Sequence, residues 1–565
     1  MSRSLNERLV EQLSLLKSEF SSASARRITS ILGQLRRLII RDAETLTRYH
    51  ETLLFLRAYP QTGPIVRSVE AELRNFHRRV EFLREQEVDL SHMEHPEMSG
   101  ISGHSVSDTF SFEIVRWLVA KHANEISLDW DWFDSENRLA DAWPRFMPLM
   151  EEDTFVEANI PYREWLRRAR NGTAEIRWLI SRFDKLLVSE REKAELYNAQ
   201  QLYVRWTPPY RSTRTGLRSP DNHAIFYQRG PLIRRREVHL DIEVSKPVRN
   251  IELLSPTEGS RALDLAREAS TVRYRELYGF THGDPGCVLR VSLDRGLILH
   301  VVGLPPERRL PLRAYHAAMI YRNSVPVGYF EGLSLCDRME SGFNLYYTFR
   351  EGETAWLYAQ TLKVMRYLTG VSAFSLDPYQ IGYENKEGIE SGAFWFYRKL
   401  GFRSTDAALR QLTASEEKKL ASTGKYRTSE RTLRRLAQAP MICGLDEQRH
   451  SDWDRFHIRN IGMRVQKKMA EAYKGDAALM RTKSVKFMES RLSFDSSVLN
   501  RSQQRVFADF AVVLSLVGDL RNWNDQEKQQ VVSIIRAKAG VDERRYLREL
   551  QKHDKLRRAL IGLGS

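Results

Sequence analysis

The stretch SGAFWFYRKLGFR, residues 391 to 403, places one tyrosine hydroxyl within a run of aromatic side chains. One face of a short helix would carry the residues that recur at helical spacing, Ala393, Phe396, Tyr397 and Leu400. Gly401 then suits the left-handed conformation that commonly ends a helix. Packing accounts for the apolar members, but a buried phenol needs a hydrogen-bond partner. Tyr397 therefore belongs either to an ordinary core or to the edge of a substrate site.

The elements that must position this helix alternate between strands and helices. We predict strands, and one hairpin turning near residues 323–326, in the segments EVHLDIEVS (237–245), VRNIELLSP (248–256), CVLRVSL (287–293), GLILHVVGL (296–304), YHAAMIYRNSVPVGYFEGLSL (315–335), GFNLYYTF (342–349) and SAFSLD (372–377). Helical periodicity occupies residues 260–278, 352–368 and 390–400. The central region is therefore expected to be α+β.

Both flanks of this region are predicted to be helical. Apolar positions recur at helical spacing through residues 1–204, and amphipathic basic segments fill residues 411–565. Between the first flank and the central region, residues 205–229 are rich in proline and arginine, which is typical of a linker or an exposed basic loop.

Composition narrows the class of protein. The chain has 565 residues with 42% hydrophobic residues, enough to build packed cores, and its three cysteines are far apart. Neither a secretory leader nor a membrane-spanning segment is expected, so we predict a cytoplasmic protein. The net charge of +15 admits nucleic-acid binding, yet acidic residues are interleaved with the basic ones, as on any solvated charged surface. No motif predicts a metal site.

The segment from about 315 to 403 resembles the GNAT acyltransferase superfamily. The resemblance lies in the order hairpin, strand, helix, strand, helix and in the closing AFWFYRKLGFR, with Ala393, Tyr397, Gly401 and Phe402 at the family's spacing. It implies a GNAT-like domain over about 230–410, with a mixed sheet flanked by helices. It also implies acetyl-CoA or another acyl-CoA as co-substrate and an amine as acceptor.

In that family two neighbouring parallel strands part, and the coenzyme lies in the gap with its pyrophosphate at a helix start, where backbone N–H groups favour anions. The resemblance places this helix start at REGETA. The implied coenzyme-binding residues are Arg350, Gly352, Glu353, Thr354, Ala355 and, before the closing helix, Asn385.

The resemblance also implies an acid and a base. Tyr397 occupies the position from which a tyrosine protonates the leaving thiolate, and its ordinary pKa suits that step. Glu331 and Glu340 are the carboxylates best placed by sequence to take a proton from the attacking amine, and His316 is an alternative. The polar loop 377–390 could face a substrate through residues such as Tyr379, Gln380 and Tyr383.

The sequence departs from the family at the helix start. Glu351 and Glu353 stand where the family has glycines, and a carboxylate repels a pyrophosphate. Two hypotheses follow. The chain is an acyl-CoA-dependent N-acyltransferase that works by direct amine attack, or it is a non-catalytic GNAT-like scaffold that binds protein or nucleic acid.

Overall fold

The computed structural model describes residues 4–133, 136–221, 224–422, 424–445 and 451–565. The chain forms two compact units. The first comprises residues 1–231, 261–281 and 322–326, and the second comprises residues 232–260, 282–321 and 327–565. No helix within these described ranges is both long enough and apolar enough to cross a membrane.

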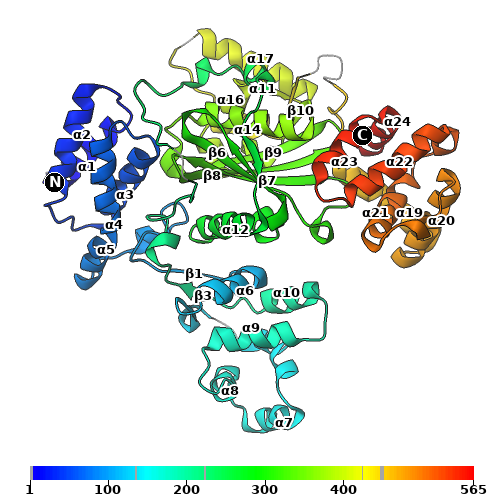
Figure 1. The fold of residues 1–565 in the computed structure, drawn as a ribbon, viewed down its shortest axis with the longest axis horizontal. Helices are drawn as coiled ribbons and strands as arrows, with labels where there is room; N and C mark the ends of the chain where they lie inside the picture. The colour runs from blue at the N-terminus through cyan, green and yellow to red at the C-terminus, as the bar shows by residue number, and fades with distance from the viewer. Residues whose placement is uncertain (1–3, 134–135, 222–223, 423, 446–450) are drawn as a thin grey trace. The chain divides into compact units, whose positions relative to one another are not determined.

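The first unit is mainly helical (Figure 1). Its helices are α1 (Leu5–Leu16), α2 (Ser22–Leu35), α3 (Ala43–Ala58), α4 (Gly63–Arg74), α5 (Phe76–Glu85), α6 (Phe112–Lys121), α7 (Leu149–Ala158), α8 (Tyr162–Ala169), α9 (Glu175–Lys185), α10 (Glu190–Ala199), most of α12 (Pro256–Thr271), and α13 (Tyr278–Thr281). The sequence missed a small antiparallel sheet here, in the order β1 (Val106–Asp108), β3 (Val204–Trp206), β2 (Ile126–Leu128). Strands this short give little period-2 signal.

The segment 205–229, predicted to be a linker or an exposed basic loop, is buried in its described stretch around Arg214. Arg214 is 3% exposed, and its guanidinium pairs with Glu51 and donates to the main-chain oxygen of Glu97. The neighbouring Thr213 and Thr215 are fully buried. Buried ion pairing of this kind depends on residues far away in the sequence, so composition alone could not indicate it.

The second unit is built on a nine-stranded sheet in the order β11-β12-β10-β9-β8-β7-β6-β5-β4. The strands are β4 (Ile251–Leu253), β5 (Val288–Ser292), β6 (Leu297–Val302), β7 (Ala314–Arg322), β8 (Val325–Leu335), β9 (Arg338–Leu345), β10 (Ala373–Leu376), β11 (Arg403–Ser404) and β12 (Met441–Gly444). The tip of the β7–β8 hairpin, residues 322–326, belongs to the first unit. Mixed α+β architecture with helical flanks is therefore confirmed.

The helices of the second unit cover the sheet and extend beyond one end of it (Figure 1). They are α11 (Leu240–Ser245), α14 (Thr354–Thr369), α15 (Lys386–Glu390), α16 (Ala393–Arg398), α17 (Ala407–Ser422), α18 (Glu430–Leu436), α19 (Ile458–Tyr473), α20 (Ala477–Leu492), α21 (Arg501–Leu514), α22 (Asp525–Lys538), α23 (Glu543–Gln551) and α24 (Asp554–Gly564). The helix α14 is buried along nearly its whole length and ends at Gly370, which adopts a left-handed conformation with φ 77°.

Three predictions about this unit were wrong. The segment 237–245 contains the helix α11 instead of a strand: Leu240 and Val244 are buried at i and i+4, whereas Ile242 is exposed. The strand expected at 342–349 begins earlier and ends at Leu345. Residues 411–565 are not all helical, because β12 inserts between β10 and β11.

Candidate functional site

The strands β9 and β10 lie in parallel but pair over only a short distance. Arg338 to Glu340 of β9 pair with Ala373 to Ser375 of β10. Beyond that point β9 continues to Leu345 and pairs with β8, while β10 ends at Leu376. The chain then enters the 3-10 helix η11 (Pro378–Ile381). The backbone pairing of the two strands therefore ends at Glu340, one residue before the end of β10, and we call the unpaired stretch beyond it, which side chains fill, the gap.

Side chains, not backbone, bridge this gap. The Ser341 hydroxyl donates to the main-chain oxygen of Ser375 at 3.3 Å and lies 2.9 Å from the Tyr358 hydroxyl. Further along, Gln380 Nε2 donates to the main-chain oxygen of Phe343 at 3.0 Å. The Phe343 carbonyl is thus directed into the gap as a hydrogen-bond acceptor.

Tyr397 reaches the same gap from α16. Its hydroxyl accepts a hydrogen bond from Gln380 Nε2 at 3.2 Å, and the residue is 3% exposed. Its ring packs edge-on against Tyr358, with centroids 5.5 Å apart. Burial raises the pKa of Tyr397, so the phenol keeps its proton at neutral pH. Gly401, with φ 101°, ends this turn as the sequence predicted.

Glu340, the last β9 residue paired with β10, lines a cavity of about 520 Å³. The residues around this cavity come from distant parts of the chain: Arg313, Arg338, Glu340, Leu376, Asp377, Pro378, Tyr383, Gln438, Pro440, Phe456, His457, Ile458 and Arg459. A cavity of this size suits a small molecule. The Glu340 carboxylate lies 3.6 Å from Arg338 and 3.9 Å from Arg313, both too far for a hydrogen bond.

The other two candidate bases do not line this cavity. Glu331 pairs across the ladder with Gly342, and its carboxylate accepts a hydrogen bond from the Tyr315 hydroxyl. Burial raises the pKa of Glu331, while the bond from Tyr315 opposes that shift. His316 is 3% exposed, and burial lowers its pKa to about 4, so it is neutral at physiological pH.

The start of α14 carries most of the residues expected to bind coenzyme. Glu353 is the residue preceding the helix; its carboxylate is fully buried, pairs with Arg295 and accepts the Ile233 N–H at 3.1 Å. Arg295 belongs to the turn between β5 and β6, which lie on the side of β9 away from β10. The carboxylate is therefore held away from the gap, and its charge is balanced inside the fold.

The other side chains at that helix start bond within the fold, so only its main chain would be left to bind an anion. The Thr354 hydroxyl donates to the main-chain oxygen of Arg350 at 2.8 Å, and Arg350 pairs with Glu387. Gly352 is half-buried, and Thr354 and Ala355 are the first helical residues. The first N–H groups of a helix lack partners within it, so this start fits a phosphate group through its main chain.

The loop before α16 divides into structural and cavity-facing residues. Asn385 caps α15: its side chain accepts the Gly388 N–H and donates to the main-chain oxygen of Tyr379. Tyr383 lines the cavity, Gln380 lies in the gap, and Tyr379 is exposed.

Sequence reasoning missed Arg313, Arg338, Asp377, His457 and Arg459 as cavity residues. Apart from His457 and Arg459, which are two residues apart, they lie far from one another in the sequence, and the pairing of β9 with β10 and the packing of the C-terminal helices bring them together. Among the described residues, no cluster of three or more histidine, cysteine or carboxylate side chains is placed to hold a metal ion.

Comparison with known proteins adds no relative. No protein-family model, no curated protein and no solved structure matches the chain.

Proposed function

We propose that the second unit is an N-acyltransferase that takes its acyl group from a thioester of coenzyme A. The observation that carries this proposal is the end of the β9–β10 ladder at Glu340, beyond which Gln380 bonds both the Phe343 carbonyl and the Tyr397 hydroxyl, while Glu340 itself lines a cavity. The strand order supports the same proposal. The parallel strands β9 and β10 are joined by α14, which agrees with the order strand, helix, strand that the GNAT resemblance implies.

The chemistry divides between the two sides of the gap. A bound acyl thioester supplies an activated carbonyl to an amine lying in the cavity. Glu340 takes the proton that the amine nitrogen loses as the new C–N bond forms, because its carboxylate lines the cavity and makes no short hydrogen bond. Tyr397 gives its proton to the sulfur as the C–S bond breaks, so the products are an amide and a free thiol.

Two elements of the chain would hold the acyl-CoA. The Phe343 carbonyl would accept a hydrogen bond from an amide N–H in the extended arm of the coenzyme, in place of the one that Gln380 Nε2 donates in this structure. The N–H groups at the start of α14 offer donors to its phosphates. The internal pairing of Glu353 with Arg295 supports this assignment, because a balanced and buried carboxylate repels a nearby phosphate less than a bare one.

The alternative hypothesis, a scaffold that binds no acyl-CoA, draws support from Glu351, which is exposed at the same helix start. Binding of acetyl-CoA and of longer acyl-CoA thioesters to the full chain distinguishes the transferase from the scaffold. It is measured by calorimetry and by thermal unfolding. We expect binding with a positive thermal shift. Absence of heat and of any shift at millimolar thioester would favour the scaffold.

Transfer itself is tested by the release of free thiol from acyl-CoA in the presence of amines. We expect Glu340→Gln to reduce amine-dependent release by about a hundredfold while acyl-CoA binding persists. Glu331→Gln is the matched control, since it removes a carboxylate from the same face of the sheet but not from the cavity. Equal losses in both variants would remove Glu340 from the mechanism.

A further inference from the structure

The charges around the Glu340 cavity are unequal. Arg313, Arg338 and Arg459 contribute three guanidinium groups, against the two carboxylates of Glu340 and Asp377. His457 also lines the cavity, but burial, together with the nearby arginines, lowers its pKa and favours its neutral form. One positive charge is therefore left in excess where the acceptor amine would enter.

Arg338 is fixed in one orientation. Its guanidinium lies over the rings of Trp453 and Phe456, 5.7 and 5.4 Å from their centroids, and its Nε donates to the Ser375 hydroxyl at 2.8 Å. Its side chain is only 13% exposed, and burial lowers its pKa. Because the Nε donor is already used, the terminal nitrogens are the ones that remain near the cavity and Glu340.

Arg459 completes the cationic side. It is exposed at the start of α19 and makes no ion pair with any residue that the structure describes. The exposed Arg459 and the fixed, partly desolvated Arg338 line the same cavity and together form a pair of donors that suits a planar carboxylate or a phosphate.

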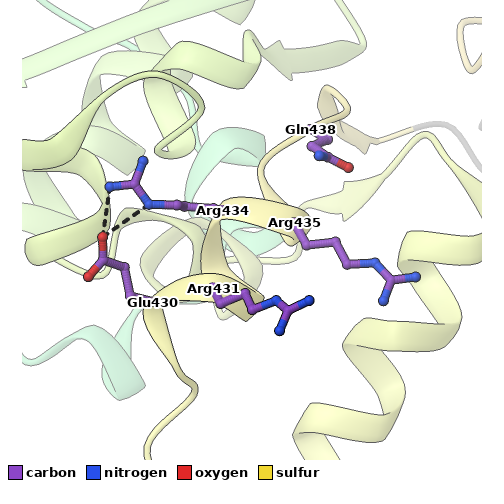
Figure 2. A pocket seen from close by; sticks show the side chains of 5 residues that line it. All are labelled: Glu430, Arg431, Arg434, Arg435 and Gln438. Carbon is purple, nitrogen blue, oxygen red and sulfur yellow. Dashed lines mark hydrogen bonds and ion pairs between the residues drawn. The ribbon is translucent and has the colours of Figure 1, made fainter.

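The cationic surface continues outside the cavity. Gln438 lines both the cavity and a neighbouring surface hollow formed by α18. In that hollow Arg434 pairs with Glu430 at 2.7 Å, whereas Arg431 and Arg435 point away from this pair (Figure 2). The excess of positive charge around the entrance would raise the local concentration of anionic molecules.

We propose that the acceptor is a small amine that also carries an anionic group, a carboxylate or a phosphate, close to its nitrogen. Arg338 and Arg459 hold the anion, and Glu340 faces the amine. An amine without an anion would leave the excess cation unbalanced, whereas a single anionic group matches the one positive charge in excess. The assignment of this molecule as acceptor rests on the proposed transferase function.

Paired ligands test this inference. Each common amino acid is compared with the amine formed by its decarboxylation, and O-phosphoethanolamine is compared with ethanolamine. Affinities are measured by calorimetry on the full chain, with and without coenzyme A. We expect at least one anion-bearing amine to bind at least tenfold more tightly than its partner, and the carboxylate and phosphate arms show which anion is used.

A matched pair of variants locates the effect. Arg459→Gln is expected to weaken that amine about tenfold, equivalent to about 1.4 kcal/mol. Arg464→Gln removes the same charge from the same helix, at an exposed position outside the cavity, and should change the affinity less than twofold. Equal weakening in both variants, equal binding within every ligand pair, or binding by no amine would overturn the inference.

The two proposals fail separately. Acyl-CoA binding without discrimination between paired amines would refute the acceptor class and leave the transferase standing. Binding of an anion-bearing amine in a protein that binds no acyl-CoA would refute the transferase, and the cavity would then be a binding site of the inferred ligand class.

Discussion

Gln380 offers a quantitative test of where the thioester lies, because its amide makes two hydrogen bonds inside the gap. In the Gln380→Ala variant the Phe343 carbonyl and the Tyr397 hydroxyl lose this donor. Each such bond contributes about 0.5–1.5 kcal/mol, so the free energy of unfolding should fall by about 1–3 kcal/mol.

The same change should strengthen acyl-CoA binding. In the wild type, an amide of the bound acyl-CoA must displace Gln380 from the Phe343 carbonyl, whereas in the variant this hydrogen bond is absent and need not be broken. A hydrogen bond worth about 0.5–1.5 kcal/mol corresponds to about two- to tenfold tighter binding of acyl-CoA. Urea unfolding measures the first effect, and calorimetry with acetyl-CoA measures the second.

Gln360→Ala is the control for this experiment. Gln360 is buried on α14, and its Nε2 donates to Glu243 at 2.7 Å, so its loss should also destabilise the fold. Acyl-CoA affinity should then stay unchanged, because neither residue contributes to the bridge across the gap. Weaker or unchanged acyl-CoA binding in Gln380→Ala would refute the idea that acyl-CoA and Gln380 compete for the Phe343 carbonyl.

Three further perturbations follow from the buried groups. Tyr397→Phe should cost about 1 kcal/mol of stability but reduce thiol release by about 10²- to 10⁴-fold; a loss below tenfold would contradict its role as acid. Arg295→Ala should lower the free energy of unfolding in urea by about 3 kcal/mol, because Glu353 stays buried without this guanidinium, and adding Glu353→Gln should restore part of it. The pKa of His316 is about 4 when folded and near 6.5 when unfolded, so the unfolded chain takes up the proton first. Its contribution to the free energy of unfolding should fall by about 2 kcal/mol from pH 7 to pH 5, and His316→Phe should show a flatter pH profile than the wild type.

The sequence was most informative where a local pattern decides the structure. The hairpin of β7 and β8 turns at Asn323 and Ser324, both with positive φ, within the predicted turn. The alternating pattern wrongly predicted a strand where the structure has α11. Apolar residues at i, i+2 and i+4 fit either a strand or a helix, and the burial of Leu240 and Val244 decides for the helix. The four-residue β12 is too short for periodicity to reveal.

The candidate site was predictable only in part. Tyr397 and Glu340 were named because each lies in a recognisable local stretch; in the structure Glu340 is the last residue of the β9–β10 ladder, and the Tyr397 hydroxyl bonds Gln380, which bridges the gap beyond it. Sequence spacing could not choose Glu340 over Glu331, since both lie on the same face of the sheet and the choice depends on which of them borders the cavity and on the hydrogen bond from the Tyr315 hydroxyl to Glu331. The arginines around Glu340 depend on contacts between remote segments, which a single sequence does not display.

A crystal structure of the full chain with coenzyme A tests the central claim most directly. The account predicts that the extended arm of the coenzyme runs along β9 beyond Glu340, with Gln380 displaced from the Phe343 carbonyl and the sulfur beside the Tyr397 hydroxyl. Coenzyme A bound elsewhere, with the Gln380 bridge intact, would contradict it.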